Sequence, residues 1–185
     1  MNANMKQDKA MLSDLKALRS RAREQIMKGA VTPSYAEADR KAIAELLNTA
    51  LATEIVCVLR YRRHYYMASG IHSESVKAEF LEHANEEQEH ADQIAERIVQ
   101  LGGEPDLDPA GLLSRSHSEY VEGKTLRDML REDLVAERIA IDSYRGIVTW
   151  LDGKDSTTRR IMEEILAKEE EHAEDLSTLL ANIPD

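Results

Sequence analysis

The sequence predicts an all-α protein whose main part is a four-helix bundle. Its 185 residues include only four prolines, eight glycines and one phenylalanine, a composition typical of long helices rather than of sheets. Four long segments carry apolar residues at helical spacing. A pattern of one glutamate followed by a Glu-x-x-His sequence occurs once in each half of the chain, with equivalent residues 82 or 83 positions apart. This repetition indicates two helical hairpins of similar construction.

Residues 1–32 are expected to form a partly helical N-terminal arm, ahead of a bundle domain at residues 33–185. Seven basic residues outnumber three acidic ones in the first 30 residues, whereas the whole chain has a net charge of −11. Such an arm can contact DNA phosphates, or it can pair with the acidic surface of its own or a neighbouring subunit. We favour the second alternative, because no aromatic or base-reading motif accompanies the charges.

The first hairpin is expected to consist of helices at about residues 35–69 and 73–101. Pro33 suits the start of the first helix, and Gly70 suits its end. Ser73 is a suitable N-cap for the second helix. Because the link between the two helices is short, they should lie antiparallel.

The second hairpin is expected at about residues 124–151 and 156–181, again with a short link. Residues 103–122 connect the two hairpins and contain two prolines and several serines, which makes a continuous helix there unfavourable. A short helical turn can still form at residues 109–114. Two hairpins joined by such a long crossover form a recognised bundle topology.

The repeated pattern places glutamates and histidines within the apolar stripes of these helices. Glutamate-rich helices can produce Glu-x-x-His by chance on a solvated face, but four buried carboxylates without cations would be costly or would have to take up protons. Residues three apart share a helix face, so a Glu and a His at this spacing can reach one metal pair. We therefore predict a dinuclear metal site. Its ligands are Glu54, Glu87, His90, Glu137, Glu169 and His172.

Charge and composition argue against several other classes of protein. The negative net charge disfavours contact of the bulk surface with nucleic acid or anionic membrane. We expect no apolar run of the ~18 residues that a membrane span needs, and the polar N-terminus does not resemble a signal peptide. The single cysteine, Cys57, excludes an intrachain disulfide and fits a reducing compartment, so we expect a cytoplasmic protein. Cys57 itself is expected to be a small buried residue of the core.

Four segments carry a resemblance to a known family. They are ELLNTALATEIVCVLRYRRHYYMASG, EEQEHADQIAERIVQLGGEPDL, LREDLVAERIAIDSYRGIV and ILAKEEEHAEDLSTLL. Over residues 44–182 the chain resembles the ferritin-like superfamily, and most closely bacterioferritin. The resemblance implies a ferritin-like bundle with a di-iron site and with Tyr61 beside it, while His64 matches a histidine on the same helix. In that site Glu54 and His90 are terminal ligands of one iron, Glu137 and His172 are terminal ligands of the other, and Glu87 and Glu169 bridge the two.

The chain departs from the bacterioferritin pattern in three ways. The family's haem-ligating methionine directly follows the glutamate of the second helix, but Gln88 occupies that position here, so no haem is expected. The family's short fifth helix, which helps to close a 24-subunit shell, has no counterpart before Asp185, and the N-terminal arm is additional. These departures resemble Dps-like proteins with a bacterioferritin-type site, which implies 12 subunits rather than 24. Rubrerythrins are disfavoured because their CxxC module needs more than one cysteine.

Other polar residues are given weaker roles. Tyr61 is expected either to hydrogen-bond or donate an electron at the site, or to be an ordinary core tyrosine. No function is assigned to His72, His83 or His117. The glutamates that neighbour the ligands point away from the apolar stripes. They are expected on the surface or behind the ligands: Glu86, Glu89, Glu170 and Glu171.

Three functions follow as hypotheses. The leading one is a ferroxidase that oxidises Fe(II) with O2 or H2O2 at two iron ions per subunit and stores Fe(III) in a homo-oligomeric shell. Manganese or zinc can replace iron in such a ligand set. The second is a dimeric, non-storage di-metal peroxidase or oxidase containing iron or manganese. The third is a Dps-like protein that protects DNA by means of the basic arm. None of the three involves a membrane.

Overall fold

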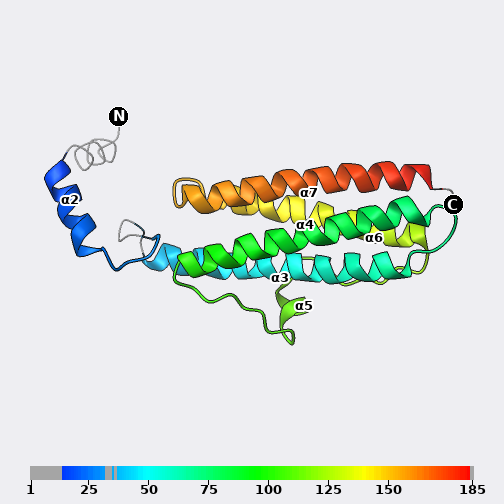
Figure 1. The fold of residues 1–185 in the computed structure, drawn as a ribbon, viewed down its shortest axis with the longest axis horizontal. Helices are drawn as coiled ribbons and strands as arrows, with labels where there is room; N and C mark the ends of the chain where they lie inside the picture. Colours follow the sequence, from blue (N-terminus) through cyan, green and yellow to red (C-terminus); the bar gives the residue numbers. More distant parts are fainter. Residues whose placement is uncertain (1–13, 32–34, 36, 184–185) are drawn as a thin grey trace.

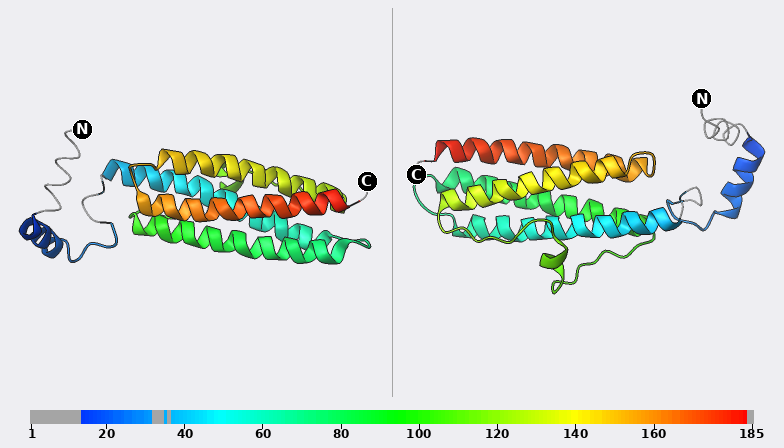
Figure 2. Two further views of the ribbon diagram at one scale, coloured as in Figure 1. Left: turned by 90° about the horizontal axis from the view of Figure 1, so that it is seen from above. Right: turned by 180° about the vertical axis from the view of Figure 1, so that it is seen from behind.

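The computed structural model describes residues 14–31, 35 and 37–183, and every regular element within them is an α-helix. Four long helices lie side by side as a bundle (Figure 1), and the same grouping is seen from above and from behind (Figure 2). The predicted all-α four-helix bundle is confirmed. In chain order the helices are α2 (Leu15–Glu24), α3 (Glu37–Met67), α4 (Ser73–Gln100), α5 (Leu112–Arg115), α6 (Leu126–Trp150) and α7 (Ser156–Asn182).

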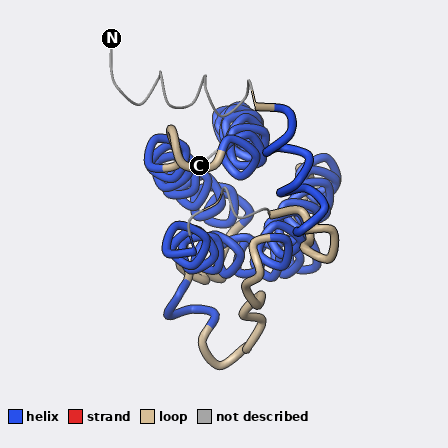
Figure 3. Tube along the Cα trace, turned by 90° about the vertical axis from the view of Figure 1, so that its left-hand side faces the viewer, coloured by secondary structure: helices blue, strands red, loops and turns tan. Residues whose placement is uncertain are grey.

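The bundle consists of two hairpins, as predicted. Helix α3 packs along α4, and α6 packs along α7, with fewer contacts between the hairpins; Figure 3 shows the four helices end-on. Gly70 and Gly153 have positive φ angles of 111° and 72° in the two turns, a conformation that glycine adopts without steric cost. The prediction that Ser73 is an N-cap is wrong. His72 precedes the helix, and the Ser73 hydroxyl instead donates to the carbonyl oxygen of Gly70 at 2.8 Å.

Side-chain caps fix the starts of α6 and α7. Thr125 and Asp128 form a capping box, in which each side chain accepts from the backbone N–H of the other residue at 3.1 Å. The Asp155 carboxylate accepts from the first backbone N–H groups of α7. These caps agree with the predicted starts near residues 124 and 156.

The crossover between the hairpins is held against α3. The Asn48 side chain donates to the carbonyl oxygen of Glu104 at 3.1 Å and accepts from the backbone N–H of Asp106 at 2.8 Å. Leu112, the first residue of α5, packs against Ala52 and Val56 of α3. The short turn predicted at residues 109–114 is therefore present, shifted slightly towards the C-terminus.

The apolar core is divided into two clusters along the bundle. Every long helix contributes to both clusters, and the six predicted ligands lie between them in each helix. The resulting arrangement encloses the polar residues at mid-bundle, away from both ends. Fully buried members of the first cluster include Leu47, Ile94, Leu151 and Ile165, and those of the second include Tyr61, Phe80, Leu130 and Leu176.

The expectation that no segment is apolar enough to span a membrane is wrong for α3. Residues Asp39–Met67 include an 18-residue window with a mean hydropathy of 1.7. However, 56% of that window is buried within the protein, and α3 also carries Glu54 at mid-bundle. The apolar composition of α3 is explained by its central place in the core, where it packs against α4, α5 and α6.

Helix α2 lies beyond one end of the bundle (Figure 1), and none of its residues is buried. Asp14 caps it by accepting from the backbone N–H of Ala17 at 3.0 Å. Three basic side chains project from it into solvent, those of Lys16, Arg19 and Arg23. The remainder of the predicted arm at residues 1–13, together with Pro33, lies outside the described residues.

A buried ionic network links α3, α6 and the end of the crossover. The Arg60 guanidinium donates to Asp133 Oδ1 at 2.8 Å and to the carbonyl oxygen of Glu119 at 2.8 Å. The other oxygen of Asp133 lies 2.8 Å from His64 Nδ1. His64, which was matched to a family histidine, is thus engaged by Asp133 and does not belong to the metal-ligand cluster.

Replacing Asp133 by Ala is expected to destabilise the protein by about 3–5 kcal/mol, because Arg60 would remain buried without its counter-charge. Denaturant unfolding followed by circular dichroism measures this change. Asp142→Ala, at an exposed position of the same helix, is the control and should change stability by no more than ~0.5 kcal/mol. Equal effects of the two substitutions would contradict a structural role for the network.

Candidate metal centre

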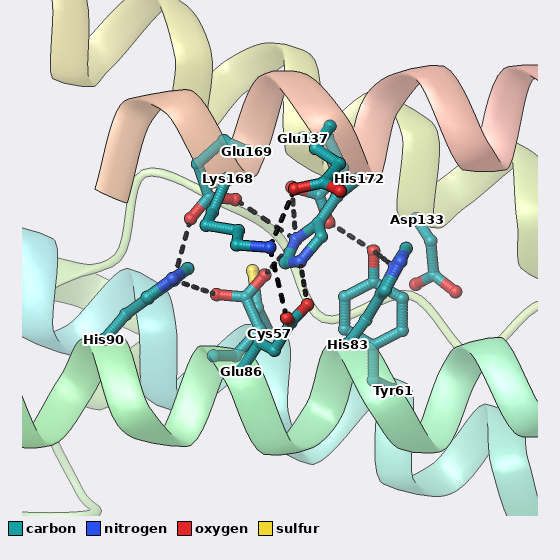
Figure 4. A network of polar contacts seen from close by, with 12 residues as sticks. Cys57, Tyr61, His83, Glu86, His90, Asp133, Glu137, Lys168, Glu169 and His172 are labelled. Atoms are coloured by element: carbon teal, nitrogen blue, oxygen red, sulfur yellow. Dashed lines mark hydrogen bonds and ion pairs between the residues drawn. The ribbon is translucent and has the colours of Figure 1, made fainter. Parts of the chain in front are cut away.

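All six predicted ligands meet at mid-bundle, and each is at most 4% exposed. Helices α3 and α6 contribute one glutamate each, whereas α4 and α7 contribute a Glu-x-x-His pair each, as the sequence pattern predicts. Figure 4 shows His90, Glu137, Glu169 and His172 converging from three of these helices. The residues form two four-membered groups whose ligand atoms lie within 4.8 Å of one another. The groups are Glu54, Glu87, His90 and Glu169, and Glu87, Glu137, Glu169 and His172.

Glu87 and Glu169 belong to both groups, which is the position that bridging carboxylates require. Each histidine directs its Nδ1 atom at the carboxylates of its own group. His90 Nδ1 lies 3.1 Å from Glu169 Oε1 and 3.4 Å from Glu54 Oε2. His172 Nδ1 lies 3.6 Å from Glu87 Oε1 and 3.9 Å from Glu137 Oε2. Two metal ions, each with one terminal histidine and one terminal glutamate, fit this arrangement.

The cluster contains unsatisfied polar atoms that suit a cation. In native proteins nearly all buried polar atoms have hydrogen-bond partners, so a concentration of exceptions requires an explanation. Here each of the six residues has one buried nitrogen or oxygen without a hydrogen bond. These atoms are Glu54 Oε2, Glu87 Oε1, His90 Nδ1, Glu137 Oε2, Glu169 Oε1 and His172 Nδ1. Carboxylate oxygens and imidazole nitrogens are the donors that iron, manganese and zinc accept.

Without a metal, protons must neutralise the cluster. Burial raises the pKa values of Glu54 and Glu169 well above the usual range for a carboxyl group. Burial alone would lower the pKa of His90, but the carboxylates of Glu54 and Glu87, at 3.4 Å and 3.7 Å from its Nδ1, outweigh burial and raise that pKa to about 10. The pKa of His172 rises to about 9 in the same way, through Glu87 and Glu137. Metal binding must therefore displace protons from the cluster.

Two tyrosines orient the terminal glutamates, each from the opposite hairpin. The Tyr61 hydroxyl on α3 donates to Glu137 Oε1 on α6, and the Tyr144 hydroxyl on α6 donates to Glu54 Oε1 on α3. In both glutamates the other oxygen is the unsatisfied one. The structure thus places Tyr61 at the site and adds Tyr144, which is not among the residues predicted from the sequence. A signal was available, because each tyrosine follows the glutamate of its own helix by seven residues.

Tyr144→Phe is expected to lower the affinity of the cluster for a divalent cation by roughly 10–100-fold, the usual effect of removing a hydrogen bond that orients a ligand. The change leaves Glu54 Oε1 without its donor while keeping the aromatic ring in the core. Anaerobic titration with Co(II) measures the affinity. Tyr65→Phe, at a partly buried position of α3, is the matched control. Unchanged affinity in the Tyr144 variant would contradict the assigned role.

Residues around the cluster divide as the sequence predicted, with one exception. Glu89, Glu170 and Glu171 are exposed, and Glu86 lies behind a ligand, with its Oε2 2.7 Å from His172 Nε2. Cys57 is buried, as expected, and its sulfur lies 3.6 Å from Arg60 Nη2. Gln88, at the position of the haem methionine, is exposed and donates to Asp92 at 3.0 Å. His72 and His117 are exposed residues away from the cluster.

The exception is His83, which had no assigned role. It is buried, its ring stacks on His172 with centroids 4.0 Å apart, and its Nδ1 lies 3.3 Å from the Tyr61 hydroxyl. Burial and the nearby His172 lower the pKa of His83 to about 3, so its ring is neutral at physiological pH. The chain position of a lone histidine carries no signal for such contacts between helices.

Several known proteins are similar to this chain in sequence and in fold. The chain is 30% identical over 139 residues to a protein of Mycobacterium tuberculosis named bacterioferritin, covering 75% of this chain and 83% of that protein. It is 32% identical over 142 residues to a nutrient stress-induced DNA-binding protein of Nostoc, and the match covers 75% of this chain and 77% of that protein. One similar solved structure is that of a dodecameric thioferritin, the bacterioferritin-related protein of Bacteroides fragilis. It has a TM-score of 0.74 at 36% identity, and the match covers 77% of this chain and 86% of that chain.

The solved structure of Dps from Thermosynechococcus elongatus has the same TM-score at 21% identity and covers 77% of this chain and 92% of its own. At that identity it supports the fold alone. The ferritin-like domain family itself matches residues 44–185, which include all four bundle helices apart from the first turns of α3. With its two helical hairpins and its buried carboxylate–histidine cluster, the chain belongs to the ferritin-like domain family.

Proposed function

We propose that the protein oxidises Fe(II) at the mid-bundle cluster and holds the resulting Fe(III) in a shell of several subunits. The observation that carries this proposal is the set of six unsatisfied donor atoms, one from each of the six residues. Four carboxylates and two imidazoles supply the ligands of two iron ions. Oxygen-rich ligand sets of this kind favour Fe(III) over Fe(II) and hence favour oxidation.

The chemistry of the bound iron is a two-electron transfer. Two Fe(II) ions become two Fe(III) ions, and O2 takes up the two electrons with two protons to give H2O2; if H2O2 is the oxidant, the same electrons and protons give two water molecules. Glu87 and Glu169 would hold both ions, because each carboxylate belongs to both ligand groups. His90 and His172 would each supply the terminal nitrogen ligand of one ion. Tyr61 and Tyr144 keep the terminal carboxylates in place before iron binds.

The storage part of the proposal rests on the relatives. The B. fragilis protein, at 36% identity, is dodecameric, and the mycobacterial relatives are named bacterioferritins. We therefore favour a 12-subunit shell for this chain over a 24-subunit one. The net charge of −11 suits a protein that attracts Fe(II).

Size-exclusion chromatography with light scattering and in-line iron detection, after addition of excess Fe(II) in air, tests the proposal. A particle of about 12 chains that carries far more than the ~2 iron atoms per chain of a dinuclear site would support storage. A dimer with only ~2 metal ions per chain would instead establish the non-storage di-metal oxidase or peroxidase. A shell that takes up no iron would contradict both functions.

DNA protection is a second candidate, favoured by a separate observation. The relatives from Nostoc and Synechococcus are named DNA-binding proteins, and α2 exposes basic side chains beyond the end of the bundle. A gel-shift comparison of the full chain with a variant lacking residues 1–30 tests it. Binding that the deletion abolishes would support this role, whereas unchanged binding, or none by either protein, would remove the arm from consideration.

A further inference from the structure

A second cluster of possible ligands lies next to the dinuclear site. Glu79 and His83 on α4 and Asp175 on α7 bring one ligand atom each to within 4.8 Å of one another. His83 is only 2% exposed, while the two carboxylates are half-buried at the edge of the bundle. Figure 4 shows His83 beside Tyr61, on the side of His172 opposite His90. This cluster shares no residue with the six described above.

The hydrogen bonds of Tyr61 determine which nitrogen of His83 is free. The single hydroxyl proton of Tyr61 is donated to Glu137 Oε1. His83 Nδ1 lies 3.3 Å from the same hydroxyl oxygen, so in this hydrogen bond the ring must be the donor. The ring proton is therefore on Nδ1. In a neutral imidazole the other nitrogen, Nε2, then carries a lone pair. His83 accordingly presents an acceptor to its surroundings on the side away from Tyr61.

That lone pair faces other acceptors. His83 Nε2 lies 3.4 Å from Glu79 Oε1, and the Asp175 carboxylate completes the group. Nearby acidic residues, Asp175 among them, add to burial in raising the pKa of Glu79, as expected for negative groups held close together. An imidazole lone pair and two carboxylates that converge in this way repel one another unless a proton or a cation lies between them.

The internal repeat shows that the fold does not need polar residues here. The ligands of the second hairpin follow those of the first by 82 residues, from Glu87 to Glu169 and from His90 to His172. At the same offset, the counterpart of Glu79 is Ile161, and the counterpart of His83 is Ile165. Both isoleucines pack in the apolar core of the bundle. The polar pair is therefore a specific feature of the first hairpin rather than a requirement of helix packing.

We propose that His83 Nε2 and the carboxylates of Glu79 and Asp175 form a third divalent-cation site, separate from the dinuclear site. One imidazole and two carboxylates suit Fe(II), Mn(II), Co(II) or Zn(II). Because Glu79 and Asp175 are half-buried, solvent can supply the remaining ligands. The site connects to the dinuclear centre through one chain of hydrogen bonds, from His83 to Tyr61 and from Tyr61 to Glu137.

Anaerobic equilibrium dialysis of the full-length protein against Co(II), with metal counted per chain, tests the proposal. The wild type is expected to bind three ions and the double variant Glu79→Gln/Asp175→Asn two. Both substitutions preserve side-chain shape at half-buried positions, so the bundle should remain folded. Glu174→Gln, at the exposed neighbouring position, removes a surface charge without touching the cluster and should still bind three.

The number of Co(II) ions bound per chain distinguishes a failure of the third site from a failure of the dinuclear site on which the proposed function rests. A wild type that binds two ions, or a double variant that binds as many as the wild type, overturns the third site. A loss of the same size in Glu174→Gln overturns it too, because the ion would then depend on surface charge alone. If the dinuclear site fails instead, the wild type is expected to bind a single ion, and the double variant none.

Discussion

Replacing Glu87 and Glu169 together by Ala is expected to lower the rate of Fe(II) oxidation by about 100-fold or more, close to the rate in buffer alone. Removal of a residue that only orients a metal ligand typically lowers metal affinity or activity by roughly 10–100-fold. Glu87 and Glu169 are predicted to be ligands themselves, so a larger loss is expected. Each of them belongs to both ligand groups, so neither iron position keeps its full ligand set. Stopped-flow absorbance after mixing with Fe(II) in air measures the loss.

The matched control is Glu89→Ala/Glu170→Ala, which alters the exposed glutamates two and one residues further along the same two helices. It removes the same number of charges and should oxidise iron as the wild type does. Alanine has the highest helix propensity, so both double variants should keep a helical circular dichroism spectrum. Oxidation at the wild-type rate in the Glu87/Glu169 variant would show that the reaction occurs elsewhere in the protein.

The sequence predicted the site residues that recur at regular spacing along the chain. Helical spacing located the four long helices to within a few residues, and the repeat of 82 or 83 residues identified the six residues that the structure brings together. This works because a Glu and a His three apart share a helix face whatever the tertiary contacts are. Burial then follows from the apolar neighbours of each ligand on that face.

What the sequence could not predict depends on contacts between helices. Tyr144 and Glu54 are 90 residues apart, so their hydrogen bond follows from how the two hairpins pack. His83 meets Tyr61 from a neighbouring helix, and nothing at its own position signals that contact. Ser73 was misassigned as an N-cap because local propensity does not specify whether a serine hydroxyl donates or accepts. The hydropathy of α3 was underestimated for a related reason, since only its central place in the core explains it.

For the metal-free protein, the free energy of unfolding is expected to fall as the pH rises from about 6.5 to 9. The pKa values of His90 and His172 are about 10 and 9 in the folded protein, against an unperturbed value of about 6.5. Between these limits the folded state holds protons that the unfolded state has released, so raising the pH favours unfolding. The stabilisation is complete below pH ~6.5, and each imidazole loses on the order of 1 kcal/mol per pH unit above it.

Binding of Co(II), which stays divalent under anaerobic conditions, should reverse this dependence, because the metal replaces the protons that the cluster otherwise needs. Saturation at 100 times the dissociation constant adds ~3 kcal/mol for one site, or about 5–10 °C in melting temperature for a chain of this length. Since protons compete with the metal, that gain should be larger at pH 8 than at pH 6. Calorimetry between pH 6 and pH 8, with and without Co(II) under anaerobic conditions, measures the melting temperature and its increase on metal binding. The Glu87→Ala/Glu169→Ala variant should lose most of that increase. Equal melting temperatures with and without the cation at pH 8 would mean that the six converging side chains do not form a metal site in the folded protein.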